Sequence, residues 1–283
     1  MNVAFLGIPF DDATTFRPGA RFGPSAVRES SRLIRPYNQS LLVSPFKELN
    51  VIDFGDVDVV PGYIEDTFGK IENTIDELVR SNVFPLVCGG DHSVTLPILR
   101  SLKRKFGKMS LIHFDAHSDC WNEYFGRKYN HGTTFRRAAE EGLIDPNTSV
   151  QIGIRGPLFT ENDTKSVRSL GFEVITTDSI SEKGTSKVIS AIHERVKSPT
   201  YISLDIDCVD PAFAPGTGTP EAGGLTSREI ISFVRGLKDV DAVGFDLVEV
   251  APPYDSSSIT AILAANLLFE VLSTLALGKK RSR

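Results

Sequence analysis

The feature that most constrains the fold of this chain is an alternation between short apolar runs and stretches with helical spacing of apolar residues. The apolar runs lie at 3–8, 50–54, 84–88, 110–114, 149–154, 172–176, 201–204 and 242–247. Helical patterns lie at 66–82, 93–105, 186–196, 227–237 and 257–277. Such alternation predicts a mainly parallel sheet covered by helices on both faces. Because no low-complexity linker or fixed repeat interrupts it, we expect one α/β domain over residues 1–283.

Composition narrows the class of protein further. A net charge of −5 and a pI of about 5.6 disfavour general affinity for nucleic acids or anionic membranes. The sequence has no uninterrupted apolar run of about 18 residues, so we expect no membrane span. Its three cysteines, Cys88, Cys120 and Cys208, are widely spaced, which fits a reducing cytoplasm better than a disulfide scaffold. We expect these thiols to pack as small apolar side chains rather than to bind metal.

Three polar motifs directly follow three of the apolar runs: G-G-D-H-S at 89–93, D-A-H-S-D at 115–119 and D-I-D at 205–207. Side chains two residues apart in an extended chain point the same way, so those within a motif can converge. The carboxyl ends of parallel strands meet at one edge of a sheet, where ligands of such folds bind. The residues offered at that edge are His92, Asp115, His117, Asp119, Asp205 and Asp207.

Four carboxylates and two imidazoles are more than one divalent ion needs, but two ions that share bridging carboxylates would use them all. Carboxylates at the ends of buried strands also require a neutralising positive charge. The set lacks thiolates and therefore favours a hard or borderline ion such as Mn²⁺ over a structural zinc ion. A D-x-D pair alone is common in solvated loops, and G-G-D-H alone is weaker still. Their combination at three strand ends predicts a two-metal hydrolase.

These motifs resemble the signatures of the ureohydrolase family, which comprises arginases, agmatinases and related hydrolases of guanidino groups. The match runs almost end to end, and the stretch S-L-D-I-D-C-V-D-P-A-F-A-P-G-T-G-T-P-E at 203–221 is highly specific. The resemblance implies an arginase-like three-layer α/β/α fold with an eight-stranded parallel sheet and two Mn²⁺ per chain. One ion would take His92 and Asp119, the other would take His117 and Asp207, and the remaining two aspartates would bridge them.

The resemblance also implies roles in catalysis. Hydrolysis of a guanidinium group would give urea and a primary amine, with Asp119 handing a proton to the leaving amine. His131, in an N-H-G-T motif, would shuttle protons, and Glu249, in a D-L-V-E-V motif, would pair with the guanidinium. Thr219 is a candidate substrate contact, although a purely turn-forming role is equally consistent with its T-G-T-P context. The relatives are trimers or hexamers, which implies a homo-oligomer.

The segment 120–130 bears on which guanidino compound is cleaved. Arginases hold the α-carboxylate and α-amine of arginine with a polar Ser-Gly-Asn element here, whereas this chain carries aromatic residues. A polar site selects strongly for the group that it pairs with, so we expect a substrate without the α-carboxylate. Stretches 7–11, 17–24 and 151–155 also look more like agmatinases. The resemblance therefore predicts agmatine, hydrolysed to putrescine and urea, with guanidinobutyrate, aminopropyl-agmatine, arginine and formiminoglutamate as alternatives.

Two other classes of protein stay open at this point. A single-zinc amide hydrolase of the deacetylase type shares the fold in outline and would use Asp115, His117 and Asp205. A non-catalytic module that binds a metal or a guanidino ligand is the third interpretation, which His131 and Glu249 disfavour.

Three further polar residues carry weaker signals. His113 lies inside an apolar run, so we expect a buried histidine with satisfied hydrogen bonds. His193 has charged neighbours in a helical pattern and is predicted to be exposed. Asp91 would either orient His92 or support the turn that precedes it.

Overall fold

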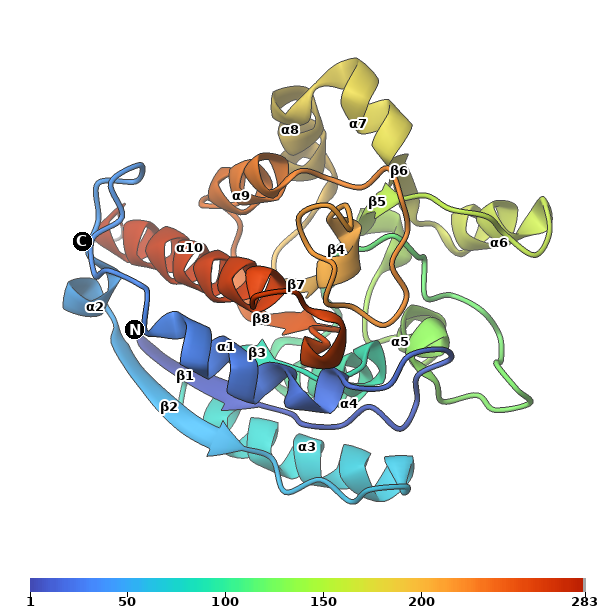
Figure 1. The fold of residues 1–283 in the computed structure, drawn as a ribbon, viewed down its shortest axis with the longest axis horizontal. Coiled ribbons are helices and arrows are strands. Elements are labelled where there is room, and N and C mark those ends of the chain that lie inside the picture. The colour runs from blue at the N-terminus through green and yellow to red at the C-terminus, as the bar shows by residue number, and fades with distance from the viewer. Residues whose placement is uncertain (282–283) are drawn as a thin grey trace.

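The computed structural model describes residues 1–281, and its centre is one eight-stranded sheet (Figure 1). The strands are β1 (Asn2–Gly7), β2 (Asn50–Asp56), β3 (Val83–Cys88), β4 (Ser110–Phe114), β5 (Val150–Ile154), β6 (Glu173–Thr176), β7 (Thr200–Asp205) and β8 (Ala242–Val248). They are hydrogen-bonded in the order β2-β1-β3-β8-β7-β4-β5-β6, and each neighbouring pair is parallel. This confirms the predicted parallel sheet, and every predicted run forms a strand close to the expected limits.

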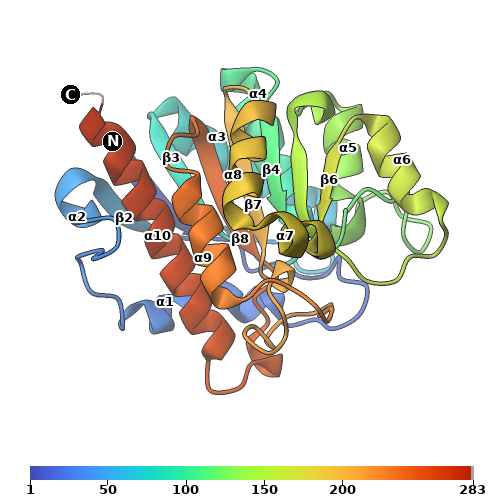
Figure 2. The same cartoon turned by 90° about the horizontal axis from the view of Figure 1, so that it is seen from above.

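Helices cover both faces of the sheet and give a three-layer α/β/α architecture (Figure 2). One face packs against α3 (Ile64–Arg80), α4 (Thr95–Phe106), α5 (Thr134–Glu140) and α6 (Asn162–Leu170). The other face packs against α1 (Gly23–Ser31), α7 (Thr177–Lys183), α8 (Thr185–Arg195), α9 (Ser227–Gly236) and α10 (Ile259–Arg281). A short helix, α2 (Pro45–Glu48), precedes β2 and contacts α10. Each face therefore has its own apolar core.

The five helices predicted from sequence are all present, as α3, α4, α8, α9 and α10. In α3, for example, Phe68, Ile71 and Ile75 are buried on one side of a helix whose other residues are mostly polar. The sequence pattern missed α1, α2, α5, α6 and α7. These helices are short, and α6 buries only Val167 among its nine residues, so it has almost no apolar periodicity to detect.

The C-terminal helix α10 is apolar around most of its circumference. By length and composition, Ile259–Gly278 could cross a membrane, but 78% of that window is buried inside the folded chain. The helix contacts α1, α2 and α9 and belongs to the core on their face of the sheet. A helix without a polar face fits either a membrane or a protein core, and the burial of α10 places it in the core.

The carboxyl ends of β3, β8, β7 and β4 are neighbours at the centre of one sheet edge. The chain leaves two of these strands through 3-10 turns, η2 (His92–Val94) and η5 (Ile206–Cys208). Asp91 caps η2 by accepting the backbone N–H of Ser93, and Asp205 caps η5 by accepting that of Asp207. These caps make the chain turn sharply and leave the motif side chains at the edge.

Candidate metal centre

Three of the four central strands, β3, β4 and β7, deliver the motif side chains to one place. Two groups of potential metal ligands have atoms within 4.8 Å of one another. The first comprises His92, His113, Asp115 and Asp119, and the second comprises Asp115, His117 and Asp207. Asp115 belongs to both groups, as a bridging ligand must. Except for the more exposed His117, these side chains are buried.

His92 lies at the centre of the first group. Its Nδ1 atom is 3.1, 3.0 and 3.3 Å from carboxylate oxygens of Asp115, Asp119 and Asp205, respectively. Two ligand atoms at right angles on an ion with bonds of about 2.1 Å are separated by about 3 Å. The spacing therefore suits a shared ion, and it brings Asp205 into the cluster.

Hydrogen bonds behind His92 fix which ring nitrogen faces the carboxylates. Ser203 Oγ donates to Asp246 Oδ1 at 2.6 Å, so the same Oγ accepts from His92 Nε2 at 2.8 Å. Asp246 Oδ2 also accepts from the hydroxyls of Thr95 and Tyr201. Neutral His92 thus presents a bare Nδ1, which is buried without a hydrogen-bond partner among the described residues. A lone pair that faces carboxylates is repelled unless a cation lies between them, so the donor set fits a metal ion.

His117 lies at the centre of the second group. Its Nδ1 atom is 3.4 Å from Asp115 Oδ1 and 3.0 Å from Asp207 Oδ2. The backbone N–H of Ala116 donates to Asp207 Oδ1 at 3.0 Å and leaves Oδ2 facing the histidine. Thr219 Oγ1 lies 3.4 Å from that Oδ2 atom. Thr219 is therefore beside a candidate ligand, and its contact with substrate stays a prediction.

His113 lies behind the shared carboxylate. Its Nε2 is 2.7 Å from Asp115 Oδ2, and its Nδ1 is 3.2 Å from the side-chain amide nitrogen of Gln151. The same amide nitrogen donates to Ser118 O, so it faces His113 as a donor, and His113 Nε2–H points to Asp115. The expectation of a buried, satisfied histidine is confirmed, and His113 orients the carboxylate that both groups share.

The cluster concentrates negative charge where water is excluded. Burial, followed by the charges of Asp207 and Asp115, raises the pKa of Asp205 well above its ordinary value. Burial and Asp115 likewise raise the pKa of Asp207. Burial disfavours the charged form of His92, but the neighbouring carboxylates outweigh it and raise this pKa well above its usual range. Divalent cations would replace these protons with a higher positive charge, so the electrostatics also fit metal binding.

Glu249 lies beside the cluster with one oxygen engaged and the other free. Its Oε1 accepts the backbone N–H of His92 at 3.0 Å and is 2.9 Å from His131 Nδ1. Its Oε2 is buried and has no hydrogen-bond partner in the part of the chain that the structure describes. Burial disfavours the charged form of His131, but the hydrogen bond and charge of Glu249 raise its pKa to about 9. A bare, buried carboxylate oxygen suits a planar N–H donor such as a guanidinium.

The backbone is strained at two of these residues. Asp119 has a φ of 49° and Glu249 a φ of 63°, in the left-handed region that residues other than glycine rarely occupy. Such conformations cost on the order of 1–3 kcal/mol each and cluster at functional sites. Both strained residues are ones to which sequence analysis assigned a catalytic role.

Four aromatic side chains flank the site and form what we call the aromatic cluster. Its members are Trp121, Tyr124, Phe125 and Phe159, with neighbouring ring centroids 5.4 to 6.1 Å apart. Phe125 is 76% exposed and Phe159 is 73% exposed, so the cluster opens to solvent. Burial raises the pKa of Tyr124, and the charges of His117 and Asp119 also act on it, which places the cluster near the candidate ligands.

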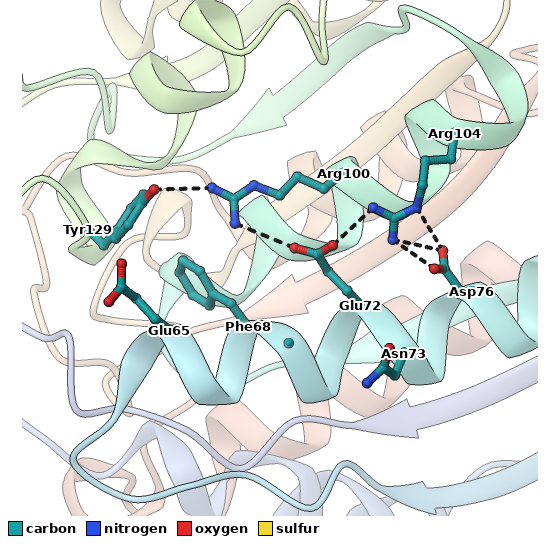
Figure 3. A pocket seen from close by; sticks show the side chains of 9 residues that line it. Glu65, Phe68, Glu72, Asn73, Asp76, Arg100, Arg104 and Tyr129 are labelled. Carbon is teal, nitrogen blue, oxygen red and sulfur yellow. Dashed lines mark hydrogen bonds and ion pairs between the residues drawn. The ribbon is translucent and has the colours of Figure 1, made fainter.

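A second charged region lies between α3 and α4, around a cavity of about 460 Å³ (Figure 3). There Arg100 lies 2.7 Å from Glu141 and 3.4 Å from Glu72. Arg104 lies 2.9 Å from Glu72 and 2.8 Å from Asp76. Both guanidinium groups are therefore paired with carboxylates. We interpret this region, named the α3–α4 ion-pair network, as a structural link between the two helices.

The remaining expectations have mixed outcomes. The prediction that His193 is exposed is wrong, because it is partly buried and its Nε2 lies 2.9 Å from Gly236 O at the end of α9. Asp91 supports the turn, because it accepts the backbone N–H groups of Ser93 and Ala13 at 2.9 Å each. All three cysteines are free and buried, as expected for small apolar side chains.

Four residues that support the site were not predicted from the sequence. Thr15, Gln151 and Ser203 each contact a site histidine, and Asp246 accepts the hydroxyl of Ser203. Two of them carried a usable signal. Ser203 and Asp246 are polar residues inside strands that are mostly apolar and mostly buried. A buried polar side chain needs a partner, so such positions mark hydrogen bonds that support a site.

Comparison with known proteins places these features in context. A model of the Arginase family matches residues 1–273. The chain is 45% identical over 276 residues to a guanidinobutyrase from Pseudomonas aeruginosa, covering 97% of the chain and 86% of that protein. It is 45% identical over 276 residues to a mitochondrial agmatinase from Gallus gallus, and this match covers 97% of the chain and 81% of that protein. The solved structure of proclavaminate amidino hydrolase from Streptomyces clavuligerus is similar, with a TM-score of 0.94 at 40% identity. The match covers 98% of this chain and 92% of that one.

Proposed function

The chain belongs to the arginase family and is a hydrolase of guanidino compounds, and from that premise we propose that it cleaves agmatine to putrescine and urea with two Mn²⁺ per chain. The observation that carries the proposal is the bare, buried Oε2 of Glu249 beside a cluster rich in carboxylates. The proposal extends to a cytoplasmic homo-oligomer, a trimer or hexamer.

Each residue of the site has a separate role in the proposed hydrolysis. Bound divalent ions supply Lewis acidity, which lowers the pKa of water toward about 7 and makes hydroxide available. Glu249 Oε2 accepts an N–H of the guanidinium, while its Oε1 stays on His92 N–H and His131. Asp119 takes a proton from the nucleophile and hands it to the leaving amine. His131 then carries the proton released by the next water molecule to the product amine or to solvent.

Charge supports a cationic substrate head. Two divalent ions bring +4 and the four aspartates bring −4, so hydroxide and Glu249 leave the site negative. A guanidinium neutralises that charge, whereas a neutral amide does not. The single-zinc amide hydrolase is the weaker interpretation for this reason, and because it leaves His92, Asp119 and Asp207 without a role.

The surroundings of the site support a cationic tail, such as the ammonium group of agmatine. The exposed rings of the aromatic cluster can attract a cation through their faces. Arg155, which follows β5, is not free for a carboxylate tail because its guanidinium donates to backbone carbonyls. Those carbonyls belong to Gly153, Asp207, Cys208, Val209, Glu221 and Ala222.

A second candidate substrate is guanidinobutyrate, whose tail is a carboxylate. The guanidinium of Arg17 lies 5.1 Å from the ring centroids of Phe16 and Tyr254. A Cβ placed on Gly218 would be 2.9 Å from Arg17 O and 3.7 Å from Glu249 Oε2, so this backbone borders the proposed guanidinium site. Arg17 is therefore the candidate partner for a carboxylate tail.

A substrate panel tests the proposal. Manganese-loaded protein would be assayed with agmatine, guanidinobutyrate, arginine, aminopropyl-agmatine and formiminoglutamate, with release of urea or formamide as the readout. We expect agmatine to give the highest kcat/KM, by about tenfold or more. Preference for guanidinobutyrate that disappears in Arg17→Ala would establish the second candidate. Arginine preferred over agmatine would overturn the argument from the aromatic cluster, and no product from any compound would refute a hydrolase.

A further inference from the structure

Both ring nitrogens of His131 are engaged by the protein. Nδ1 lies 2.9 Å from Glu249 Oε1. Nε2 receives the backbone N–H of Thr15 at 3.1 Å and lies 2.8 Å from the hydroxyl oxygen of the same residue. Thr15 lies in the N-terminal segment, more than a hundred positions away in sequence. It therefore contacts the edge of the His131 ring that points away from Glu249.

The backbone contact determines the tautomer of His131. An amide N–H can only donate, so Nε2 carries a lone pair whenever the ring is neutral. The single ring proton then lies on Nδ1, where the carboxylate of Glu249 accepts it. The position of the proton thus follows from a donor on one side and an acceptor on the other.

The hydroxyl contact gives the ring a route to solvent. His131 is only 8% exposed, whereas Thr15 is partly exposed, so a proton that leaves the ring needs an intermediate group. When both nitrogens are protonated, Nε2–H can donate to Thr15 Oγ1. The hydroxyl accepts that proton while it gives its own to a solvent water, so Thr15 ends unchanged.

We infer that Thr15 is the positioning residue of His131: its N–H sets the tautomer and its hydroxyl relays protons between Nε2 and solvent. The relay role rests on the proposed hydrolase function, whereas the tautomer role does not.

The segment that carries Thr15 is anchored on both sides of it. Asp11 accepts the backbone N–H of Gly19 at 2.6 Å and forms an ion pair with Arg21. Ala13 donates its N–H to Asp91 at 2.9 Å and accepts the backbone N–H of His131 at 3.2 Å. These bonds hold the 11–21 segment against the strand ends, so the position of Thr15 does not depend on its own contacts alone.

Three acidic groups face His131 from the elements around it, and each affects its titration. Glu249 follows β8, Asp119 follows β4 and Asp91 follows β3, and the charge of each favours the imidazolium. Thr15 adds an acceptor for the second ring proton. Loss of its hydroxyl should therefore move the titration of His131 to lower pH while the three carboxylates stay in place.

Nuclear magnetic resonance of the histidine side chains tests both roles. In protein loaded with Mg²⁺, which is diamagnetic, ¹H–¹⁵N correlations assigned with His131→Asn would locate the ring protons of His131. We expect neutral His131 to be protonated at Nδ1 only, in the wild type and in Thr15→Val. We expect its pKa to fall by about 0.5 to 1 unit in Thr15→Val. A proton on Nε2 of the neutral ring would overturn the tautomer assignment, and an unchanged pKa would overturn the hydroxyl contact.

Kinetics of the manganese-loaded enzyme test the relay. Thr15→Val should lower kcat about tenfold, while KM stays within about twofold of the wild-type value and the metal content is unchanged. Thr15→Ser, which keeps a hydroxyl, should retain most of the wild-type kcat. The limb of the pH profile that disappears in His131→Asn should move to lower pH in Thr15→Val. Thr14→Val is the matched control, because that hydroxyl donates to Asp11 O instead. Unchanged kcat in Thr15→Val would refute the relay. Failure of the wild type on every guanidino compound would refute the proposed function and the relay, but leave the tautomer to be decided by resonance.

Discussion

Two charge-rich regions of the molecule differ in how their charges are satisfied. In the α3–α4 ion-pair network, both arginines lie within ion-pair distance of carboxylates, and the side chains are partly exposed (Figure 3). In the candidate metal centre, four buried aspartates lie around two histidines, and the bare His92 Nδ1 and Glu249 Oε2 are buried without hydrogen-bond partners among the described residues. Carboxylates that are paired with arginines have a structural role that needs no further ligand. Buried carboxylates that outnumber their positive partners indicate that a cation binds between them.

The largest effect should come from removing a central ligand. Asp119→Ala should lower metal content and reduce kcat/KM by about 10³-fold or more, because the cluster loses both a carboxylate and its proton carrier. His92→Ala should also lower metal content. Metal analysis of the purified variants and urea release would be measured together. Full activity in Asp119→Ala would show that this cluster of carboxylates is not the catalytic metal site.

The next effect separates catalysis from metal binding. His131→Asn should keep its full metal content but lower kcat by about 10²-fold, since the proton shuttle is lost while the ligands stay intact. Steady-state kinetics and metal analysis on the same preparation would test this. Loss of metal in parallel with kcat would mean that His131 belongs to the ligand shell instead.

A smaller effect concerns stability and pH in the metal-free protein. The pKa of His131 rises from an ordinary value of 6.5 to about 9 on folding. Its contribution to the free energy of unfolding is therefore fully present below pH 6.5 and lost as the pH rises through about 9. The contribution is on the order of 3 kcal/mol. Urea unfolding of wild type and His131→Asn in chelator at several pH values should show a difference that shrinks over this window. A pH-independent difference would contradict the pairing with Glu249.

The smallest effect should come from the α3–α4 ion-pair network. Glu72→Gln removes the carboxylate that contacts both Arg100 and Arg104. Because these pairs are partly exposed, we expect a loss of about 1 kcal/mol or less in the free energy of unfolding, decreasing with salt, with no change in kcat or metal content. Glu65→Gln, which lines the same cavity, controls for the change in charge. A large loss of activity in Glu72→Gln alone would remove the distinction between the two regions.

The sequence predicted the sheet well because of how parallel strands are buried. Helices cover both faces, so each strand reads as a continuous apolar run, and the eight runs matched the eight strands. The helices with a strong apolar stripe, such as α3, were equally visible. The helices that were missed, such as α6, are short and polar, and they are fixed by tertiary contacts that no local pattern records.

The candidate site was predictable to the extent that it follows strand ends. Asp115 and Asp205 come directly after or at the end of buried strands, so their meeting at one edge follows from the parallel sheet alone. Thr15 could not be found in this way, because its contact with His131 joins a loop near the N-terminus to a 3-10 turn 116 residues later. His193 was predicted to be exposed from its charged neighbours, but packing of α8 against α9 partly buries it.

The central claim is that the buried cluster holds two divalent ions. A crystal structure of the manganese-loaded protein, with anomalous scattering recorded at the manganese edge, tests it most directly. We predict two peaks about 3.5 to 4 Å apart, with Asp115 and Asp205 between them, His92 and Asp119 on one ion and His117 and Asp207 on the other. A single peak on Asp115, His117 and Asp205, or no peak within the cluster, would contradict it.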